Sequence, residues 1–269
     1  MGDENKIRDA ADAIAGVAKA VPVYQDVVQP AAKEVGTALQ TMAKTVHIAL
    51  APVSALVWGY EQLKDFVSTR VAERLKDVPP ENIIPPKPNV AGPALEALRY
   101  TGHEESLSEM YANLLAAAMT KDTAAGAHPS FVEIIKQLTS DEAKLLKYMS
   151  SAPILPMISI SRAIAGQEGQ LTILSNYSHL GSHAQCEYPQ MTPTYIDNLS
   201  RLGITHVPEF GYYTDANHYQ ALENHPEILQ LKAKIESNAG VSVTIQKKFV
   251  AITELGKQFS RICIAGPVS

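Results

Sequence analysis

Three side chains of the kinds that bind zinc lie close together in the segment HLGSHAQC: His179, His183 and Cys186. Imidazole nitrogen and thiolate sulfur are common zinc ligands, so this segment could serve a metal-dependent enzyme. Three other histidines are candidates for a fourth ligand, but none lies at a recognised spacing: His206, His218 and His225. The alternative is a polar loop whose histidines bind no metal. We expect this alternative, and therefore no metal and no cofactor.

Patterns that build other catalytic sites are absent from the sequence. There is no G-x-S-x-G nucleophile elbow, no cysteine in a known catalytic signature and no glycine-rich phosphate loop. Glu104 and Glu105 lie at an expected helix start, where carboxylates favour the helix dipole. His128 precedes a proline at a helix entry, and Asn113 flanks an apolar helix face, where one buried hydrogen bond is expected. We therefore predict that the protein is not an enzyme.

A basic surface for DNA is poorly developed. Residues 193–202 would form the recognition helix of a winged-helix domain, and Arg201 is the one basic residue in it, close to Asp197. The predicted wing carries Lys247 and Lys248. Because lysine and arginine contacts to phosphates dominate affinity for DNA, we expect no nucleic-acid partner. A winged-helix transcriptional regulator that uses these three basic residues is the alternative function.

Apolar residues recur seven apart in the N-terminal region, which is the spacing of a heptad seam. The seam residues are Leu39, Val46, Val53, Leu56, Tyr60, Leu63 and Val67. Pro52 interrupts the pattern and predicts a kink or two abutting helices. Three interpretations stay open: core packing within one chain, an interface in a homo-oligomer, and an amphipathic element at a membrane. The polar face is not rich in lysine or arginine, which weighs against the membrane.

Residues 94–138 carry a clear helical pattern. Apolar residues over 107–119 recur at the i, i+3, i+4 and i+7 positions of one helix face. Three pairs have capping-box spacing, which predicts helix starts: Ser106 with Glu109, Ser130 with Glu133, and Thr139 with Glu142. Three capped helices in succession predict a central helical domain.

A proline-rich stretch precedes these helices. Residues 78–93 hold six of the 17 prolines, which predicts an extended linker or a strap over the surface. We place the linker at residues 79–93, after the N-terminal helices of residues 1–78.

Strands join helices from residue 139 onward. PILPMISIS predicts a strand, TPTYIDNLSRLG predicts a helix that ends at Gly203, and VSVTIQKKFVAIT predicts a hairpin around 246–248. Thr253 is expected to cap a final helix. Helix, strand, helix, hairpin and helix form the order of a winged helix, here with two insertions.

The insertions cover about residues 152–191 and 205–240, and the second is expected to hold a helix around 227–237. The sequence thus predicts a mainly α fold, α+β overall. It would consist of an N-terminal and central helical bundle with a C-terminal winged-helix-like domain over residues 139–269.

Composition is that of a soluble globular protein. The chain has 269 residues, 46% hydrophobic and 19% charged, with a net charge of −5. Two cysteines form no disulfide framework, the N-terminus lacks a secretory signal, and no run reaches the roughly 20 apolar residues of a membrane span. We expect a cytoplasmic protein.

Six segments together resemble the abortive-infection alpha family of bacterial proteins. In chain order they are LAPVSALVWGYEQLKD, AGPALEALRYT, MYANLLAAAM, HPSFVEIIKQLTSDEAKLLKY, NLSRLGI and ITELGKQF, between residues 50 and 259. The resemblance implies defence against bacteriophage by halting growth or killing the infected cell, and it assigns no catalytic residues. We therefore predict a non-enzymatic antiphage protein whose seam assembles a homo-oligomer or engages a membrane peripherally. A phage or host protein is the expected partner.

Overall fold

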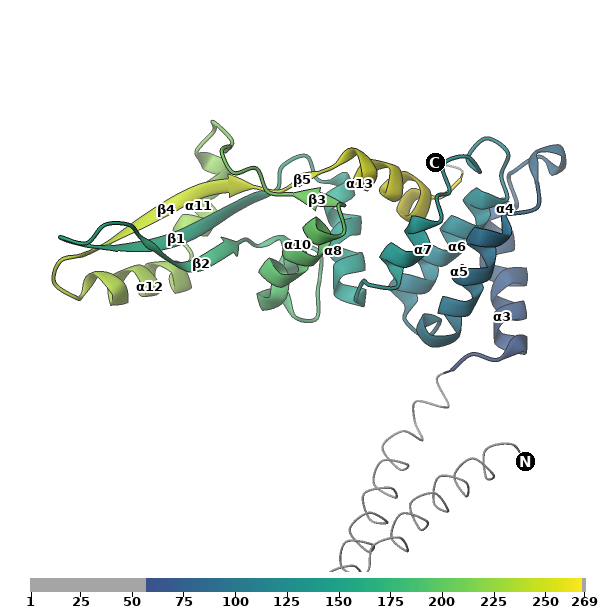
Figure 1. The fold of residues 1–269 in the computed structure, drawn as a ribbon, viewed down its shortest axis with the longest axis horizontal. Coiled ribbons are helices and arrows are strands. Elements are labelled where there is room, and N and C mark those ends of the chain that lie inside the picture. The colour runs from purple at the N-terminus through teal and green to yellow at the C-terminus, as the bar shows by residue number, and fades with distance from the viewer. Residues whose placement is uncertain (1–56, 268–269) are drawn as a thin grey trace, which may run out of the picture. The chain divides into compact units, whose positions relative to one another are not determined.

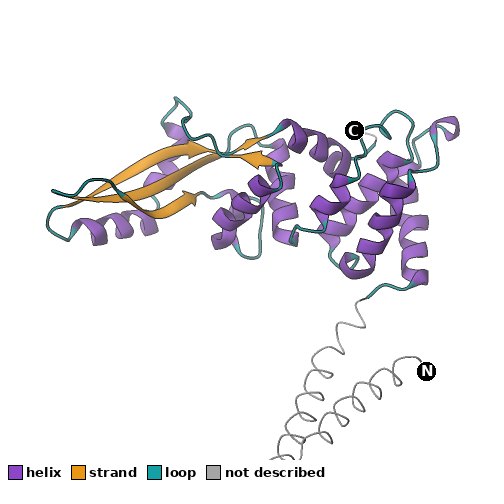
Figure 2. Cartoon of the chain, in the orientation of Figure 1, coloured by secondary structure: helices purple, strands orange, loops and turns teal. Residues whose placement is uncertain are grey.

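A computed structural model describes residues 57–267, which form one compact unit. Helices predominate over strands, so the architecture is α+β overall (Figures 1 and 2). The seam residues Leu39, Val46, Val53 and Leu56 lie outside the described residues. None of the helices in residues 57–267 is long and apolar enough to cross a membrane.

One continuous helix opens the described chain, with a π-helical segment in its middle. It consists of α3 (Tyr60–Phe66), η1 (Val67–Val71) and α4 (Ala72–Leu75). Phe66 and Val71 are both buried although they are five residues apart. A π turn bonds residues i and i+5, which places such a pair on one face.

The proline-rich stretch is extended over only part of its predicted range. It includes the short 3₁₀ helix η2 (Pro80–Asn82), and the N–H of Ile84 donates to the carbonyl of Met119 at 2.8 Å. Helix α5 (Pro88–Thr101) then begins with a proline, which is favourable because the first helical residues need no N–H donor. The last six residues of the predicted linker are therefore helical.

Helix α6 (Glu105–Ala118) is the centre of the core, with eleven of its fourteen residues buried. Helices α5, α7 (Ser130–Ile135) and α8 (Ser140–Ser151) pack around it (Figure 1). One hydrophobic cluster includes all of them and continues through Ile262 near the C-terminus. The core thus runs without a break across the predicted boundary between residues 138 and 139.

The predicted helix caps had mixed outcomes. Thr139 caps α8 in a capping box with Glu142, as predicted. The other two boxes are wrong, because Glu104 and Pro129 occupy the N-cap positions of α6 and α7. Ser106 and Ser130 consequently lie inside the first turns.

A three-stranded antiparallel sheet forms the other part of the unit. Its strand order is β2 (Leu171–Tyr177), β1 (Pro156–Ile164), β4 (Val241–Phe249). Two helices pack against this sheet through a second apolar cluster, α11 (Asn217–Glu223) and α12 (Pro226–Glu236). The helix predicted around 227–237 is thereby confirmed.

The predicted hairpin around 246–248 is wrong. Strand β4 runs straight through these residues and pairs with β1 along its whole length, from Val241 opposite Ile164 to Phe249 opposite Pro156. The two strands that flank the second insertion pair with each other over only two residues each, β3 (Thr205–His206) with β5 (Ala251–Ile252). The finer winged-helix assignment stays a prediction.

Short helices complete the unit: α9 (Leu180–His183), η3 (Pro189–Met191), α10 (Thr192–Arg201), α13 (Glu254–Phe259) and the π-helical η4 (Ser260–Ala265). Gly203 follows α10 with a φ of +75°, which confirms the predicted left-handed helix end. Thr253 accepts the N–H of Gly256 at 2.9 Å, which confirms the predicted cap of α13.

Candidate functional site

The described part of the seam is largely exposed. Tyr60 is 76% exposed and Val67 is 37% exposed, although both are large apolar residues on α3 and η1. Leu63 is half-buried and packs against the core. Phe66 forms the core face of this helix, so among the described seam residues Leu63 contacts the core while Tyr60 and Val67 remain exposed.

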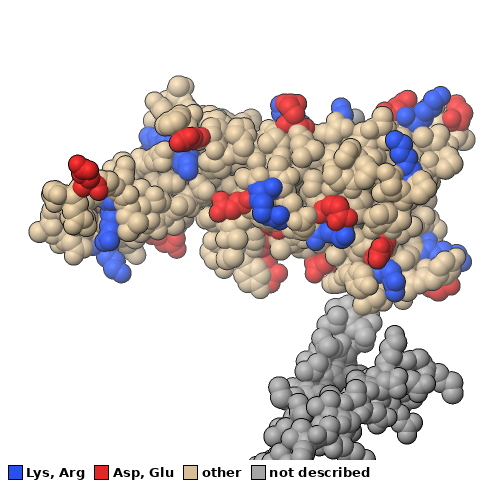
Figure 3. All heavy atoms as spheres, viewed as in Figure 1, with Lys and Arg blue, Asp and Glu red and all other residues tan. Residues whose placement is uncertain are grey.

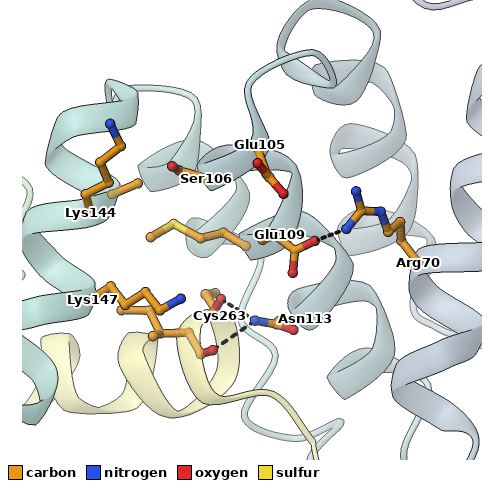
Figure 4. A pocket seen from close by; sticks show the side chains of 11 residues that line it. Arg70, Glu105, Ser106, Glu109, Asn113, Lys144, Lys147 and Cys263 are labelled. Carbon is orange, nitrogen blue, oxygen red and sulfur yellow. Dashed lines mark hydrogen bonds and ion pairs between the residues drawn. The ribbon is translucent and has the colours of Figure 1, made fainter. Parts of the chain in front are cut away.

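A polar pocket of about 420 Å³ lies beside the same continuous helix (Figure 4). It is lined by residues from η1, α6, α8 and η4. These are Arg70, Glu105, Ser106, Glu109, Met110, Asn113, Ala143, Lys144, Lys147, Cys263 and Ile264. Its volume falls within the range of ligand pockets, roughly 300–1,000 Å³.

Glu109 is the anchor of one wall. Arg70 Nη1 lies 2.7 Å from one of its carboxylate oxygens, and Arg74 Nη2 pairs with the other. The two arginines are four residues apart and so project from the same side of the helix. Neither arginine was among the predicted site residues, although their spacing in a polar segment was a signal that could have indicated them.

Asn113 joins α4 to the π-helical η4 beside the pocket. Its Nδ2 donates to the carbonyls of Cys263 at 2.9 Å and Ile264 at 3.0 Å, while its Oδ1 accepts from Arg74 Nε. Carbonyls in the last turn of a helix have no partner within it, so the amide supplies one. The buried hydrogen bonding expected of Asn113 is confirmed, and it reaches both ends of the described chain.

Two lysines of α8 form the opposite wall. Lys144 lies 3.5 Å from Asp141, whereas Lys147 makes no ion pair within residues 57–267 and points toward the pocket in Figure 4. Burial raises the pKa of the Cys263 thiol well above its ordinary value, so the thiol stays protonated near neutral pH. The pocket has charged groups that could hold a polar ligand, but its thiol is a poor nucleophile.

Three of the singled-out histidines come together near α9 and the start of α12. The ring centroids of His179 and His225 are 5.1 Å apart, and those of His179 and His183 are 6.2 Å apart. Burial, then the neighbouring His225 and His183, lower the pKa of His179. The hydroxyls of Tyr177 and Tyr148 lie 3.4 Å from ring nitrogens of His179 and His183, respectively.

Cys186 has a different environment from these histidines. Its Sγ lies 3.5 Å from the carbonyl oxygen of Asp141, and burial together with the Asp141 carboxylate raises the pKa of the thiol to about 11. Zinc binds the thiolate, which is scarce at such a pKa. Among the described residues, no three histidine, cysteine or carboxylate side chains are placed to share a metal ion.

The three basic residues of the DNA alternative lie on different elements and each has a polar partner. Arg201 on α10 donates to Gln137 and Asn198, Lys247 lies 3.3 Å from Glu223, and Lys248 donates to Asn176. Basic and acidic side chains are interspersed on the face seen in Figure 3. No observation on residues 57–267 favours DNA binding.

The chain was compared with known proteins and structures. The family model described as "Abortive infection alpha" matches residues 59–263. No curated protein matches the chain. One similar solved structure is titled "Structure of the uncharacterized protein from the hydrocarbon-degrading marine bacterium Alcanivorax borkumensis SK2". It is 17% identical, with a TM-score of 0.35, and the similarity covers 53% of this chain and 94% of that one.

The family match includes the exposed Tyr60 and Val67, all residues of the polar pocket except Ile264, and the three clustered histidines. It extends over most of the 269 residues, from the residue before α3 into η4. The chain belongs to the abortive infection alpha family.

Proposed function

We propose that the chain is a non-enzymatic abortive-infection protein that works as a homo-oligomer assembled through the seam. Membership of the abortive infection alpha family indicates a role in abortive-infection defence. The observation that carries the proposal is the pair Tyr60 and Val67, exposed on α3 and η1 while Phe66 of the same helix is buried. Exposed apolar side chains that share one face of a helix can form a contact surface.

The seam is continuous with the polar pocket. The helix that carries Tyr60 and Val67 also carries Arg70 and Arg74, whose guanidinium groups hold Glu109. A partner that shifts or rotates this helix would therefore also disturb the pocket. The proposed action is through contacts with a phage or host protein, with no chemical step assigned to the pocket.

Charge substitution in the seam tests the proposal. We expect the double variant Tyr60→Glu, Val67→Glu to form smaller assemblies than the wild-type chain, because like charges would face each other across the interface. Light scattering measures the molecular mass of the assemblies. Cells that express this variant should lose most of their protection against phage, measured as the efficiency of phage plating. Ser68→Glu is the matched control, since Ser68 is exposed on the same helix and lies outside the seam.

Three outcomes would contradict the proposal. The first is a monomeric wild-type chain, and the second is an unchanged oligomer in the double variant. The third is full phage protection by a verified monomer. Flotation with anionic liposomes separates self-association from the membrane interpretation, because flotation that depends on Tyr60 and Val67 would assign the seam to a lipid surface.

A further inference from the structure

A groove of about 460 Å³ shares no lining residue with the polar pocket. It runs between the end of α5 and the loop before η3, over the first turn of α8. Its lining includes Tyr100, His103, Glu104, Asp141, Glu187 and Tyr188.

Two tyrosines on its rim are unusually exposed for aromatic residues. Tyr100 is 58% exposed and Tyr188 is 52% exposed, and they come from different elements, α5 and the loop before η3. An aromatic ring costs free energy when its apolar face is left in water. The faces of such rings also attract cations through the ring quadrupole.

The charges of the lining are one-sided. The carboxylates of Glu104 and Glu187 line the groove, and no lysine or arginine does. The Asp141 carboxylate also lines it, but this group is buried, accepts hydrogen bonds from Glu187, Tyr188 and Tyr195, and lies 3.5 Å from Lys144. The positive end of the α8 dipole, about half a charge, is offset by the Glu142 carboxylate, which accepts the N–H of Thr139 at 2.7 Å. The groove therefore favours a cation.

The carboxylate of Glu104 is held in place rather than loose. It accepts a hydrogen bond from the Ser140 hydroxyl, and its other oxygen lies 3.5 Å from His103 Nε2. A fixed carboxylate in a groove that also exposes aromatic rings binds a planar cation at low entropic cost. An arginine guanidinium suits such a site, because it stacks on tyrosine and donates in pairs to carboxylates.

We propose that this groove, rimmed by Tyr100 and Tyr188, binds an arginine side chain of a partner protein. The proposal is independent of the seam and of the oligomeric state. It places the partner contact on a face formed by α5, α8 and the loop before η3.

Titration of the full chain with a capped pentapeptide, Ac-Gly-Gly-Arg-Gly-Gly-NH₂, tests the assignment. The matched probe carries citrulline in place of arginine, which keeps the shape and removes the charge. We expect saturable binding of the arginine peptide in the millimolar range or tighter, detected by NMR, and binding at least about fivefold weaker for citrulline, the size of an exposed cation–π contact. Raising the salt concentration should weaken only the arginine peptide.

Variants locate the binding site. Tyr188→Ala and Glu104→Gln should each weaken the arginine peptide about fivefold or more, with unchanged circular dichroism. Tyr212→Ala and Glu254→Gln are the matched controls, because Tyr212 is 63% exposed and Glu254 is exposed, and neither lines the groove. Equal binding of the two peptides, equal losses in the control variants, or no arginine binding at millimolar concentration would overturn the proposal. Dissociation of an oligomer by the arginine peptide would instead identify the occupant as a second copy of this chain.

Discussion

Asn113 donates a hydrogen bond from Nδ2 to the carbonyl oxygen of Cys263 at 2.9 Å, across 150 positions of the sequence. The same amide accepts from Arg74, so one side chain connects the first and last helices of the described chain. Removal of this side chain leaves buried carbonyls without a donor and Arg74 without an acceptor. Such losses exceed the gain from an ordinary hydrogen bond.

Asn113→Ala should therefore lower the free energy of unfolding by about 2–3 kcal/mol. Chemical denaturation followed by circular dichroism measures this change. Asn224→Ala is the control, because Asn224 is an exposed residue with no side-chain hydrogen bond within residues 57–267, and it should change stability by less than about 0.5 kcal/mol. Equal effects of the two substitutions would remove the structural role assigned to Asn113.

Gly256 and Gly92 should respond in opposite directions to alanine. A Cβ on Gly256 would lie 2.1 Å from the carbonyl oxygen of Ile204, whereas a Cβ on Gly92 in α5 meets nothing within 4 Å. We expect Gly256→Ala to destabilise the fold by more than about 2 kcal/mol, because backbone must move. Gly92→Ala should stabilise it by roughly 0.5–1 kcal/mol, since alanine is the better helix former. Thermal unfolding of both variants measures the two effects. A shift of both unfolding midpoints in the same direction would contradict this prediction.

Acid should destabilise the chain partly through Asp141. Burial by itself would raise the pKa of this carboxyl, but hydrogen bonds from the N–H groups of Glu187 and Tyr188, the Tyr195 hydroxyl and the charge of Lys144 outweigh it, so the pKa lies below the ordinary 3.8. The unfolded chain thus takes up the proton first as pH falls. The stability that the carboxylate contributes is complete above about pH 4, the pKa of the unfolded chain. It is lost as the pH falls through the lower pKa of the folded chain.

Denaturant midpoints measured between about pH 2 and pH 7 test this effect. Asp141→Asn should be less stable than wild type at pH 7, and its stability should depend less on pH below 4. Asp122→Asn, at an exposed position, should retain the wild-type pH profile. If the stability of Asp141→Asn depended on pH as that of the wild type does, Asp141 would not be a source of the acid sensitivity.

Cys186 should alkylate slowly in the folded chain. With the pKa of its thiol raised to about 11, roughly one molecule in ten thousand carries the reactive thiolate at pH 7. The rate of reaction with iodoacetamide, measured by mass spectrometry, should rise about tenfold per pH unit up to pH 10. Unfolding in guanidinium should speed the reaction strongly at neutral pH. A rate that levels off between about pH 9 and pH 10 would show an ordinary thiol.

Local rules predicted the parts of this structure that depend on neighbouring residues. The Thr139 and Thr253 caps and the left-handed Gly203 each follow from groups within a few positions, so the sequence was sufficient for them. The same holds for the long apolar face of α6, whose burial on nearly all sides was underestimated.

Non-local pairing explains what could not be predicted. The polar run at Lys247 and Lys248 looks like a turn, but these residues pair with Ile158 and Met157 of a strand some 90 positions earlier, and their ammonium groups reach Glu223 and Asn176. The polar pocket likewise combines residues from four elements, and only their packing brings Glu109 to Arg70. A single sequence does not encode such pairings in any local pattern.

The π turn at Val67–Val71 also sets the angular phase of the first helix. The π turn contains one residue more than an α-helical turn, and one residue corresponds to about 100° of rotation. The residues before the turn therefore point about 100° away from the direction that an unbroken α-helix would give them. Deleting a single residue there would leave both halves helical and still swing Tyr60 around the axis. A change of length in this one turn would therefore rotate the buried Phe66 together with Tyr60, and so change the core packing as well as the outer surface.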